Sequence, residues 1–153
     1  MTSIKTFLER GPSTSKEIQS AIGLSQSTVS RMLKKMGDGI VQISDGRSVR
    51  YAATCNAFGG NDKLPIGMID ESGRTRLVAY LRPLTCGDFF FEPAVQKYSS
   101  LLLGADRTGV YEDLPYFLLD LRPQGFLGRL IAKGIARQSD DFPVNPNAWN
   151  TNL

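Results

Sequence analysis

The chain has 153 residues, enough for one domain or two small ones, and its 41% hydrophobic and 22% charged residues are typical of a globular protein in solution. It contains no histidine and two cysteines, Cys55 and Cys86, which excludes histidine-based catalysis and a four-ligand zinc site. No apolar run approaches the roughly 18 residues needed to cross a bilayer, and the first residues lack the apolar segment of a signal peptide. We therefore expect a cytoplasmic protein without membrane contact.

Basic charge is concentrated in the N-terminal third of the chain. Residues 1–54 hold eight Lys or Arg residues against four Asp or Glu, whereas the remainder holds ten against eleven. A polyanionic partner is therefore expected to bind the N-terminal third.

Residues 4–36 predict three short helices. The first has apolar residues at helical spacing and ends at a Gly-Pro pair. The second begins where Thr14 and Glu17 have the spacing of a capping box. Gly23 supplies a tight turn, and Ser25 caps the third helix, which runs to the end of this stretch. The order helix, short turn, helix is that of a helix-turn-helix, whose second helix enters the major groove of DNA.

The third predicted helix divides into two faces. Its apolar face is expected to consist of Val29, Met32, Leu33 and Met36. Its opposite face carries two hydroxyls and a basic pair, namely Ser27, Ser30, Arg31 and Lys34. Small hydroxyl residues allow close approach to base edges and phosphates, and Arg and Lys supply charge and donors. This face is therefore predicted to contact DNA.

Two β-prone runs, 40–44 and 47–51, follow with Asp45-Gly46 between them. Asp-Gly between such runs is a strong hairpin signal, and a hairpin directly after a recognition helix is the wing of a winged helix. Arg47 and Arg50 flank its tip, so we expect them to reach the sugar-phosphate backbone or the minor groove.

The expected partner of this module is double-stranded DNA. The candidate DNA-binding residues are Ser25, Gln26, Ser27, Thr28, Ser30, Arg31, Lys34, Lys35, Arg47 and Arg50. Residues 13–36 also resemble the helix-turn-helix of transcription regulators in general. Three alternatives stay open: a winged helix that docks a protein, an RNA-binding module, and a basic face that is merely solvated.

The rest of the chain predicts a smaller β-rich unit. Residues 55–65, rich in Gly and Asn with one Pro, are expected to form a linker. Residues 66–69 and 75–84 predict an antiparallel hairpin with a polar turn between them. The triple phenylalanine at 89–91 indicates a strand covered on both faces, with a partner-binding patch as the alternative.

Two helices are predicted towards the C-terminus. The first, a buried helix, spans 114–121, and the second begins after Pro123. The apolar face of the second is expected to hold Phe126, Leu127, Leu130, Ile131 and Ile135. Its basic stripe consists of Arg129, Lys133 and Arg137. That stripe is interpreted as a solvated face, with a second phosphate contact as the alternative.

Residues 120–129, Asp-Leu-Arg-Pro-Gln-Gly-Phe-Leu-Gly-Arg, resemble the N-terminal region of HipA-like serine/threonine kinases, the toxins of bacterial toxin–antitoxin pairs. The layout resembles the branch in which a helix-turn-helix is fused ahead of the kinase, and the tail 142–149 resembles the connection to its kinase core. The resemblance implies a kinase that uses ATP and magnesium, with catalytic residues further along the chain. It also implies an antitoxin, a kinase core or a second copy as partners.

No catalytic motif, metal site or cofactor site is recognisable in these 153 residues. The chain is therefore expected to be either the front part of a longer kinase, which its abrupt ending favours, or a separately encoded regulator that binds a kinase.

The sequence thus predicts an α+β protein, in which a winged helix-turn-helix precedes a small subdomain of β-hairpins and helices. The expected divisions are a DNA-binding domain (1–54), a linker (55–65), a HipA-like N-terminal subdomain (66–138) and a connection towards an absent kinase core (139–153). The predicted function is transcription regulation through DNA binding at the N-terminus of a toxin kinase. The alternative is a protein-docking winged helix that regulates a kinase or antitoxin without binding DNA.

Overall fold

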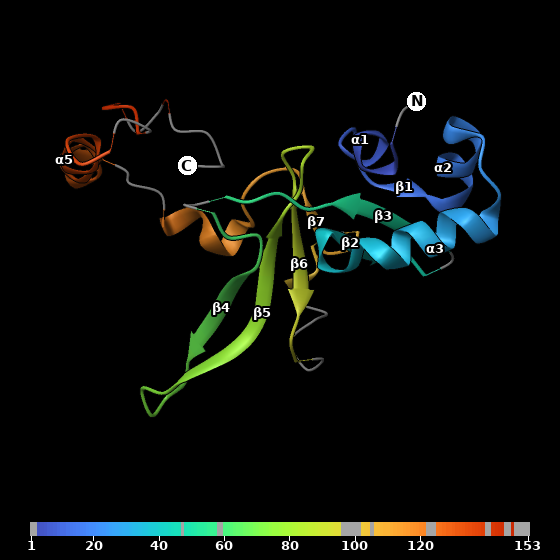
Figure 1. Ribbon diagram of the computed structural model, residues 1–153. Coiled ribbons are helices and arrows are strands. Elements are labelled where there is room, and N and C mark those ends of the chain that lie inside the picture. The colour runs from blue at the N-terminus through green and yellow to red at the C-terminus, as the bar shows by residue number, and fades with distance from the viewer. Residues whose placement is uncertain are drawn as a thin grey trace.

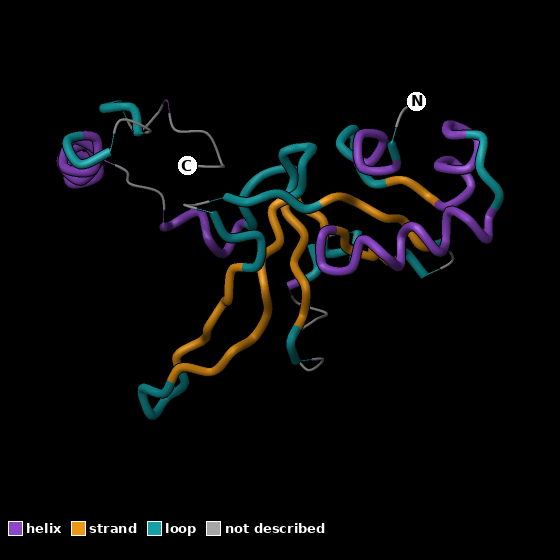
Figure 2. The backbone as a smooth tube through the Cα atoms, in the orientation of Figure 1, coloured by secondary structure: helices purple, strands orange, loops and turns teal. Residues whose placement is uncertain are grey.

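The computed structural model describes residues 3–46, 48–57, 60–95, 102–104, 106–121, 125–139, 142–145 and 148. The chain forms a mixed α+β structure with two antiparallel sheets, as predicted. Figure 2 shows helices gathered towards the two ends of the chain and strands between them. Part of the run 120–129 and part of the tail 142–149 lie outside the described residues. No helix in the described part of the chain is long and apolar enough to cross a membrane.

The N-terminal unit combines three helices with a three-stranded sheet (Figure 1). Its helices are α1 (Ile4–Leu8), α2 (Ser15–Ile22) and α3 (Gln26–Met36). A 3₁₀ turn, η1 (Gly37–Gly39), leads from α3 into the sheet. The strands are β1 (Ser13–Thr14), β2 (Ile40–Ser44) and β3 (Val49–Ala53), arranged in the order β1-β3-β2.

Local signals in the sequence account for the ends of these helices. The Thr14 hydroxyl accepts a hydrogen bond from Glu17 N at 3.2 Å, and the Glu17 carboxylate accepts one from Thr14 N at 2.7 Å, so the predicted capping box is confirmed. Gly23 ends α2 with a φ of +72°, which favours glycine because it lacks a Cβ. Ser25 caps α3, as predicted.

The core of the N-terminal unit lies between the helices and one face of the sheet. It consists of Ile4, Leu8, Ile18, Val29, Leu33 and Ala53. Met36 packs against this core, but Met32 is 40% exposed, so its predicted place on the apolar face is wrong. Met32 lies at the margin of the helical stripe that Val29 and Leu33 define, and there it remains open to solvent.

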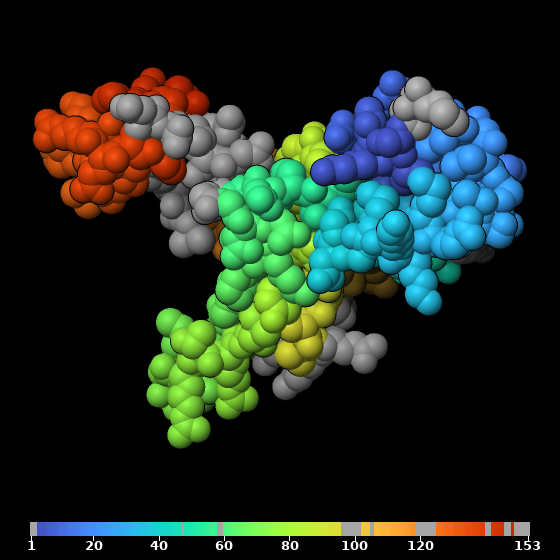
Figure 3. Space-filling view, viewed as in Figure 1, coloured from blue at the N-terminus to red at the C-terminus, as the bar shows by residue number. Residues whose placement is uncertain are grey.

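The second sheet contains four antiparallel strands in the order β4-β5-β6-β7. They are β4 (Leu64–Ile69), β5 (Thr75–Pro83), β6 (Phe89–Pro93) and β7 (Val110–Tyr111). β4 and β5 form the predicted hairpin, which projects from the body of the molecule (Figures 1 and 3). The triple phenylalanine lies in β6 with all three rings buried, which confirms the strand covered on both faces.

The two sheets are joined directly. Thr85 N donates to Ala53 O and Cys55 N donates to Pro83 O, each at 3.0 Å. A shared core links the face of the first sheet that points away from the helices to the second sheet; it contains Val41, Ile43, Ala52, Leu84 and Phe90. The predicted linker therefore lies against structured neighbours where it is described, and Ala57 within it is buried.

Of the two predicted C-terminal helices, the first differs from expectation and the second forms as predicted. The segment predicted as a buried helix over residues 114–121 forms a shorter 3₁₀ helix, η3 (Tyr116–Leu121), whose residue Tyr116 is exposed. Leu118 N donates to Pro115 O at 2.8 Å, an i→i+3 bond that tightens the turn. The last helix is confirmed as α5 (Gly125–Ala136) and stands apart from both sheets in Figure 1.

Candidate nucleic-acid interface

The polar face of α3 is open to solvent along its length. Its exposed candidate residues are Gln26, Ser27, Ser30, Arg31, Lys34 and Lys35. Within the described part of the chain, no carboxylate forms an ion pair with the three basic residues of this face. The cationic groups are thus available to an external anion without first breaking an internal pair.

The N-terminal end of α3 is organised by a group of hydroxyls. Ser25 Oγ accepts from Thr28 N at 3.4 Å and shares hydrogen bonds with Ser27 Oγ at 3.1 Å and Thr28 Oγ1 at 3.0 Å. Thr28 is half-buried, so it contributes more to this cap than to the open face. The cap holds Ser27 at the first turn, where backbone N–H groups of a helix are favourable to phosphate oxygens.

A groove of about 410 Å³ runs between α3 and the β2–β3 hairpin. It is lined by Ser30, Leu33, Lys34, Gly37, Ile40, Gln42 and Tyr51. Two predicted contact residues, Ser30 and Lys34, therefore face the hairpin across an open channel. The fold thus brings Ser30 and Lys34 of α3 beside Gln42 and Tyr51 of the hairpin.

Arg50 lies differently from the helix residues. Strand alternation places it on the sheet face of Ala52, whereas Tyr51 packs against the helical core on the other face. Its Nη2 pairs with Asp45 Oδ2 at 3.4 Å, and its Nε is buried without a hydrogen-bond partner. Arg50 thus belongs to the hairpin but is not continuous with the polar face of α3. Arg47, the other predicted hairpin residue, lies outside the described residues.

Electrostatics stabilise the start of α2, the helix before α3. Hydrogen bonds from the Thr14 N–H and hydroxyl lower the pKa of Glu17, and the charge of Arg50 contributes in the same direction. Glu17 is therefore ionised at neutral pH and held at the start of α2, where the helix dipole favours a negative charge.

The cysteines and carboxylates form no metal site in the described part of the chain. Burial raises the pKa of both Cys55 and Cys86, with nearby Asp62 adding to the effect at Cys55. Both thiols are therefore protonated at neutral pH, which does not favour metal binding or nucleophilic chemistry.

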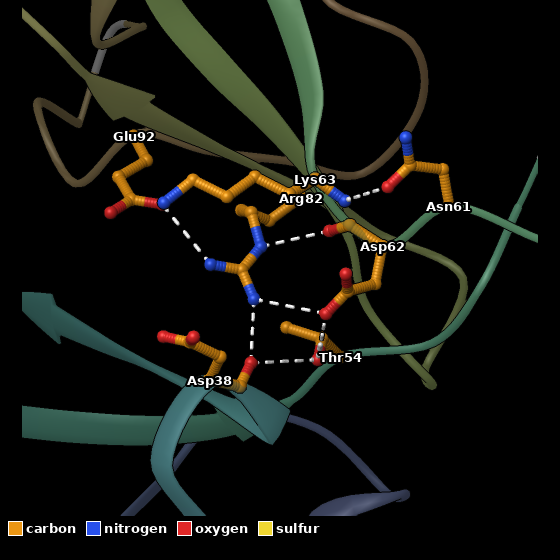
Figure 4. A network of polar contacts seen from close by, with 7 residues as sticks. All are labelled: Asp38, Thr54, Asn61, Asp62, Lys63, Arg82 and Glu92. Atoms are coloured by element: carbon orange, nitrogen blue, oxygen red, sulfur yellow. Dashed lines mark hydrogen bonds and ion pairs between the residues drawn. The ribbon is translucent and has the colours of Figure 1, made fainter.

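A residue that the sequence predictions missed lies behind the end of α3. Arg82 of β5 is almost completely buried, and Figure 4 shows its guanidinium between Asp38, Asp62 and Glu92. Nη2 donates to the backbone carbonyl of Asp38, the residue two positions after α3, at 2.6 Å. The available signal was the charged residue that interrupts the apolar second half of β5, since such a residue is buried only with partners.

Comparisons with known proteins match two parts of the chain to two different families. Residues 60–152 match the family described as YjjJ-like toxin, middle domain, and residues 5–55 match the family described as sugar-specific transcriptional regulator TrmB. Toxin YjjJ of Escherichia coli (strain K12) is 31% identical over 139 residues, which cover 90% of this chain and 29% of that protein. The chain therefore spans less than a third of the length of this relative.

No solved structure matches the chain. The match over residues 60–152 covers more than half of the sequence. The chain belongs to the YjjJ-like toxin family through its middle domain, with a TrmB-type helix-turn-helix at its N-terminus.

Proposed function

We propose that residues 1–54 form a winged helix-turn-helix that binds double-stranded DNA, with α3 in the major groove and the β2–β3 hairpin as the wing. The observation that carries this proposal is the exposed, acid-free face of α3, whose Arg31, Lys34 and Lys35 have no ion-pair partner among the described residues. The TrmB match over residues 5–55 supports the same function.

We infer different roles for the candidate residues. Ser27, Ser30 and Arg31 are exposed on α3 and are expected to approach base edges and phosphates. Lys34 lies on the groove shared with the hairpin, and the groove is open to a sugar-phosphate strand. Arg50 contributes from the wing only if a phosphate replaces Asp45 as its partner.

One helix and one hairpin contact few phosphates. Because log affinity falls with log salt by roughly 0.9 for each phosphate contacted, a single copy is expected to bind weakly at physiological salt. Strong binding to an operator then requires a dimer or an accessory antitoxin, which is why half-sites related by two-fold symmetry are expected.

Fluorescence anisotropy with duplex DNA from the promoter of its own gene tests the proposal. Arg31→Ala with Lys34→Ala is expected to weaken binding about tenfold or more and to lower the salt slope by about 2, roughly 1 for each phosphate that is no longer bound. Arg129→Ala with Lys133→Ala removes a matched basic pair from the exposed face of α5 and is expected to leave binding unchanged. A wild-type protein without salt-sensitive binding would favour the protein-docking alternative.

We also propose that the chain is the N-terminal region of a longer toxin whose following part is a HipA-like serine/threonine kinase core. Two observations support this proposal: the family match is to a middle domain, and α5 exposes the large apolar residues Phe126, Leu127, Leu130 and Ile131. A kinase core that packs on α5 would cover this face. ATP and magnesium would bind that core, with DNA binding serving autoregulation in the cytoplasm.

The native reading frame tests the kinase proposal. Coding sequence that continues in frame beyond Leu153, and a full-length product that transfers phosphate from ATP, are the expected results. A stop codon directly after Leu153 would instead favour a separate regulator that binds a kinase or antitoxin.

A further inference from the structure

Arg82 of the middle domain reaches the end of the candidate DNA-binding helix. Its side chain is 3% exposed, and its Nη2 donates to the carbonyl of Asp38 at 2.6 Å (Figure 4). Asp38 lies in η1, the turn that leads from α3 into β2. Arg82 thus connects β5 of one sheet to the exit from the helix beside the other sheet.

The Asp38 carbonyl lies just after a helix end, where backbone carbonyls accept hydrogen bonds from outside the helix. The last carbonyls of a helix and of the turn after it lack intrahelical partners, and a cation near them is favoured by the helix dipole. Here Thr54 Oγ1 also donates to the Asp38 carbonyl, at 3.3 Å. Arg82 and Thr54, which both come after α3 in the sequence, therefore hold the Asp38 carbonyl and with it the turn that follows α3.

The charge of Arg82 is balanced from both sides. Nη1 donates to Glu92 Oε2 at 3.2 Å, Nη2 donates to Asp62 Oδ2 at 3.2 Å, and Nε donates to the Asp62 carbonyl at 2.8 Å. A buried cation of this kind is tolerated because its donors are paired. The rigid fork of the guanidinium reaches these groups together, which a compact lysine ammonium cannot do.

We propose that Arg82 is a positioning residue for the DNA-binding face, acting through the Asp38 carbonyl on the end of α3 where Lys34 and Lys35 lie. The proposal rests on the proposed DNA-binding function of α3. It adds that the middle domain takes part in DNA binding, because a shift of β5 or β6 that moves Arg82 also moves the end of the helix. A partner that binds the middle domain would thereby alter DNA affinity.

The contacts around Arg82 make this coupling direct. The Ala53–Thr85 and Cys55–Pro83 backbone hydrogen bonds join the sheets beside it. The shared core that contains Val41 and Phe90 fills the space between the sheets. Movement at β5 is therefore transmitted through packed contacts rather than through a free linker.

The test compares DNA binding by the whole chain carrying Arg82→Met or Arg82→Lys over a series of salt concentrations. Arg82→Met is expected to raise the Kd about tenfold, a difference of about 1.4 kcal/mol, and to lower the salt slope by about 1, because a lysine at the end of α3 no longer reaches its phosphate. Arg82→Lys keeps the charge and is expected to lie between wild type and Arg82→Met. Arg76→Met is the matched control, because Arg76 is also on β5 and ion-paired, but exposed.

Hydrogen exchange provides a second readout that does not depend on DNA. Amides of residues 35–40 are expected to exchange faster in Arg82→Met than in Arg76→Met, while amides in the first turns of α3 keep their wild-type rates. Should Arg82→Met fail to fold, Arg82→Lys carries both measurements. If the wild type binds DNA and the folded Arg82 variants keep its Kd and salt slope, the inference about Arg82 is overturned and the proposed function stands. If the wild type does not bind DNA, the proposed function itself is overturned.

Discussion

The helices α3 and α5 both carry a basic stripe beside apolar residues, but they present opposite sides to solvent. α3 buries Val29 and Leu33 and exposes its hydroxyl and basic residues. α5 buries the small residues Gly128 and Ala132 and exposes large apolar ones, with Phe126 and Leu127 about 70% exposed. α5 makes no extensive contact with another described helix or strand, and it projects from the body in Figure 3.

This difference indicates which kind of partner the exposed surface of each helix suits. The apolar face of α3 is covered within this chain. Its exposed polar face suits a charged, hydrogen-bonding partner such as DNA. α5 leaves large apolar side chains exposed at i, i+1, i+4 and i+5, a pattern typical of a helix that packs on another protein surface. The presence of a basic stripe is therefore a poor guide to function unless the side of the helix that packs is also known.

The largest expected effect is on the free energy of unfolding, when a leucine is replaced by alanine in each of the two helices. Leu33→Ala leaves a cavity in the N-terminal core and is expected to reduce the free energy of unfolding by about 2–5 kcal/mol. Leu130→Ala removes an exposed side chain and is expected to change it by less than about 0.5 kcal/mol. Urea unfolding followed by circular dichroism measures both. Equal losses of stability would contradict the comparison, since α5 would then be packed in solution.

A smaller effect is expected from changing the exposed apolar face of α5. The isolated chain is expected to self-associate weakly through this face, and Phe126→Ser with Leu130→Ser is expected to lower that association, because covering apolar surface is favourable. Analytical ultracentrifugation at several concentrations measures the change. Met32→Ser, on the exposed margin of α3, is the control and is expected to leave the mass distribution as in wild type. Persistent self-association of the double variant would place the contact elsewhere.

The N-terminal unit could be predicted from the sequence because its signals are local. The Thr14–Glu17 capping box, the Gly23 turn and the Ser25 cap each act within about one helical turn. The Asp45-Gly46 hairpin is likewise set by neighbouring residues, and Ile43 pairs with Arg50 across it. Such interactions require no knowledge of distant segments.

The features that could not be predicted depend on contacts between distant residues. Residues 55–65 are Gly- and Asn-rich and were expected to be a linker, but Cys55 is hydrogen-bonded to Pro83. Arg82 has a role only because β5 passes behind Asp38. The contact roles of the ten candidate residues stay predictions, and for Arg50 the structure adds a competing partner in Asp45.

The smallest expected effect is a change in the pH dependence of unfolding when the capping box of the N-terminal unit is altered. Hydrogen bonds from Thr14 lower the pKa of Glu17, so the folded state favours the ionised carboxylate. This contribution is present above the ordinary pKa of glutamate and is lost as the pH falls through the lowered value. Glu17→Gln should therefore remove part of the acid sensitivity of thermal unfolding. Glu9→Gln is the control, because the Glu9 carboxylate has no hydrogen bond among the described residues. An identical pH dependence in both variants would show that the capping box does not contribute.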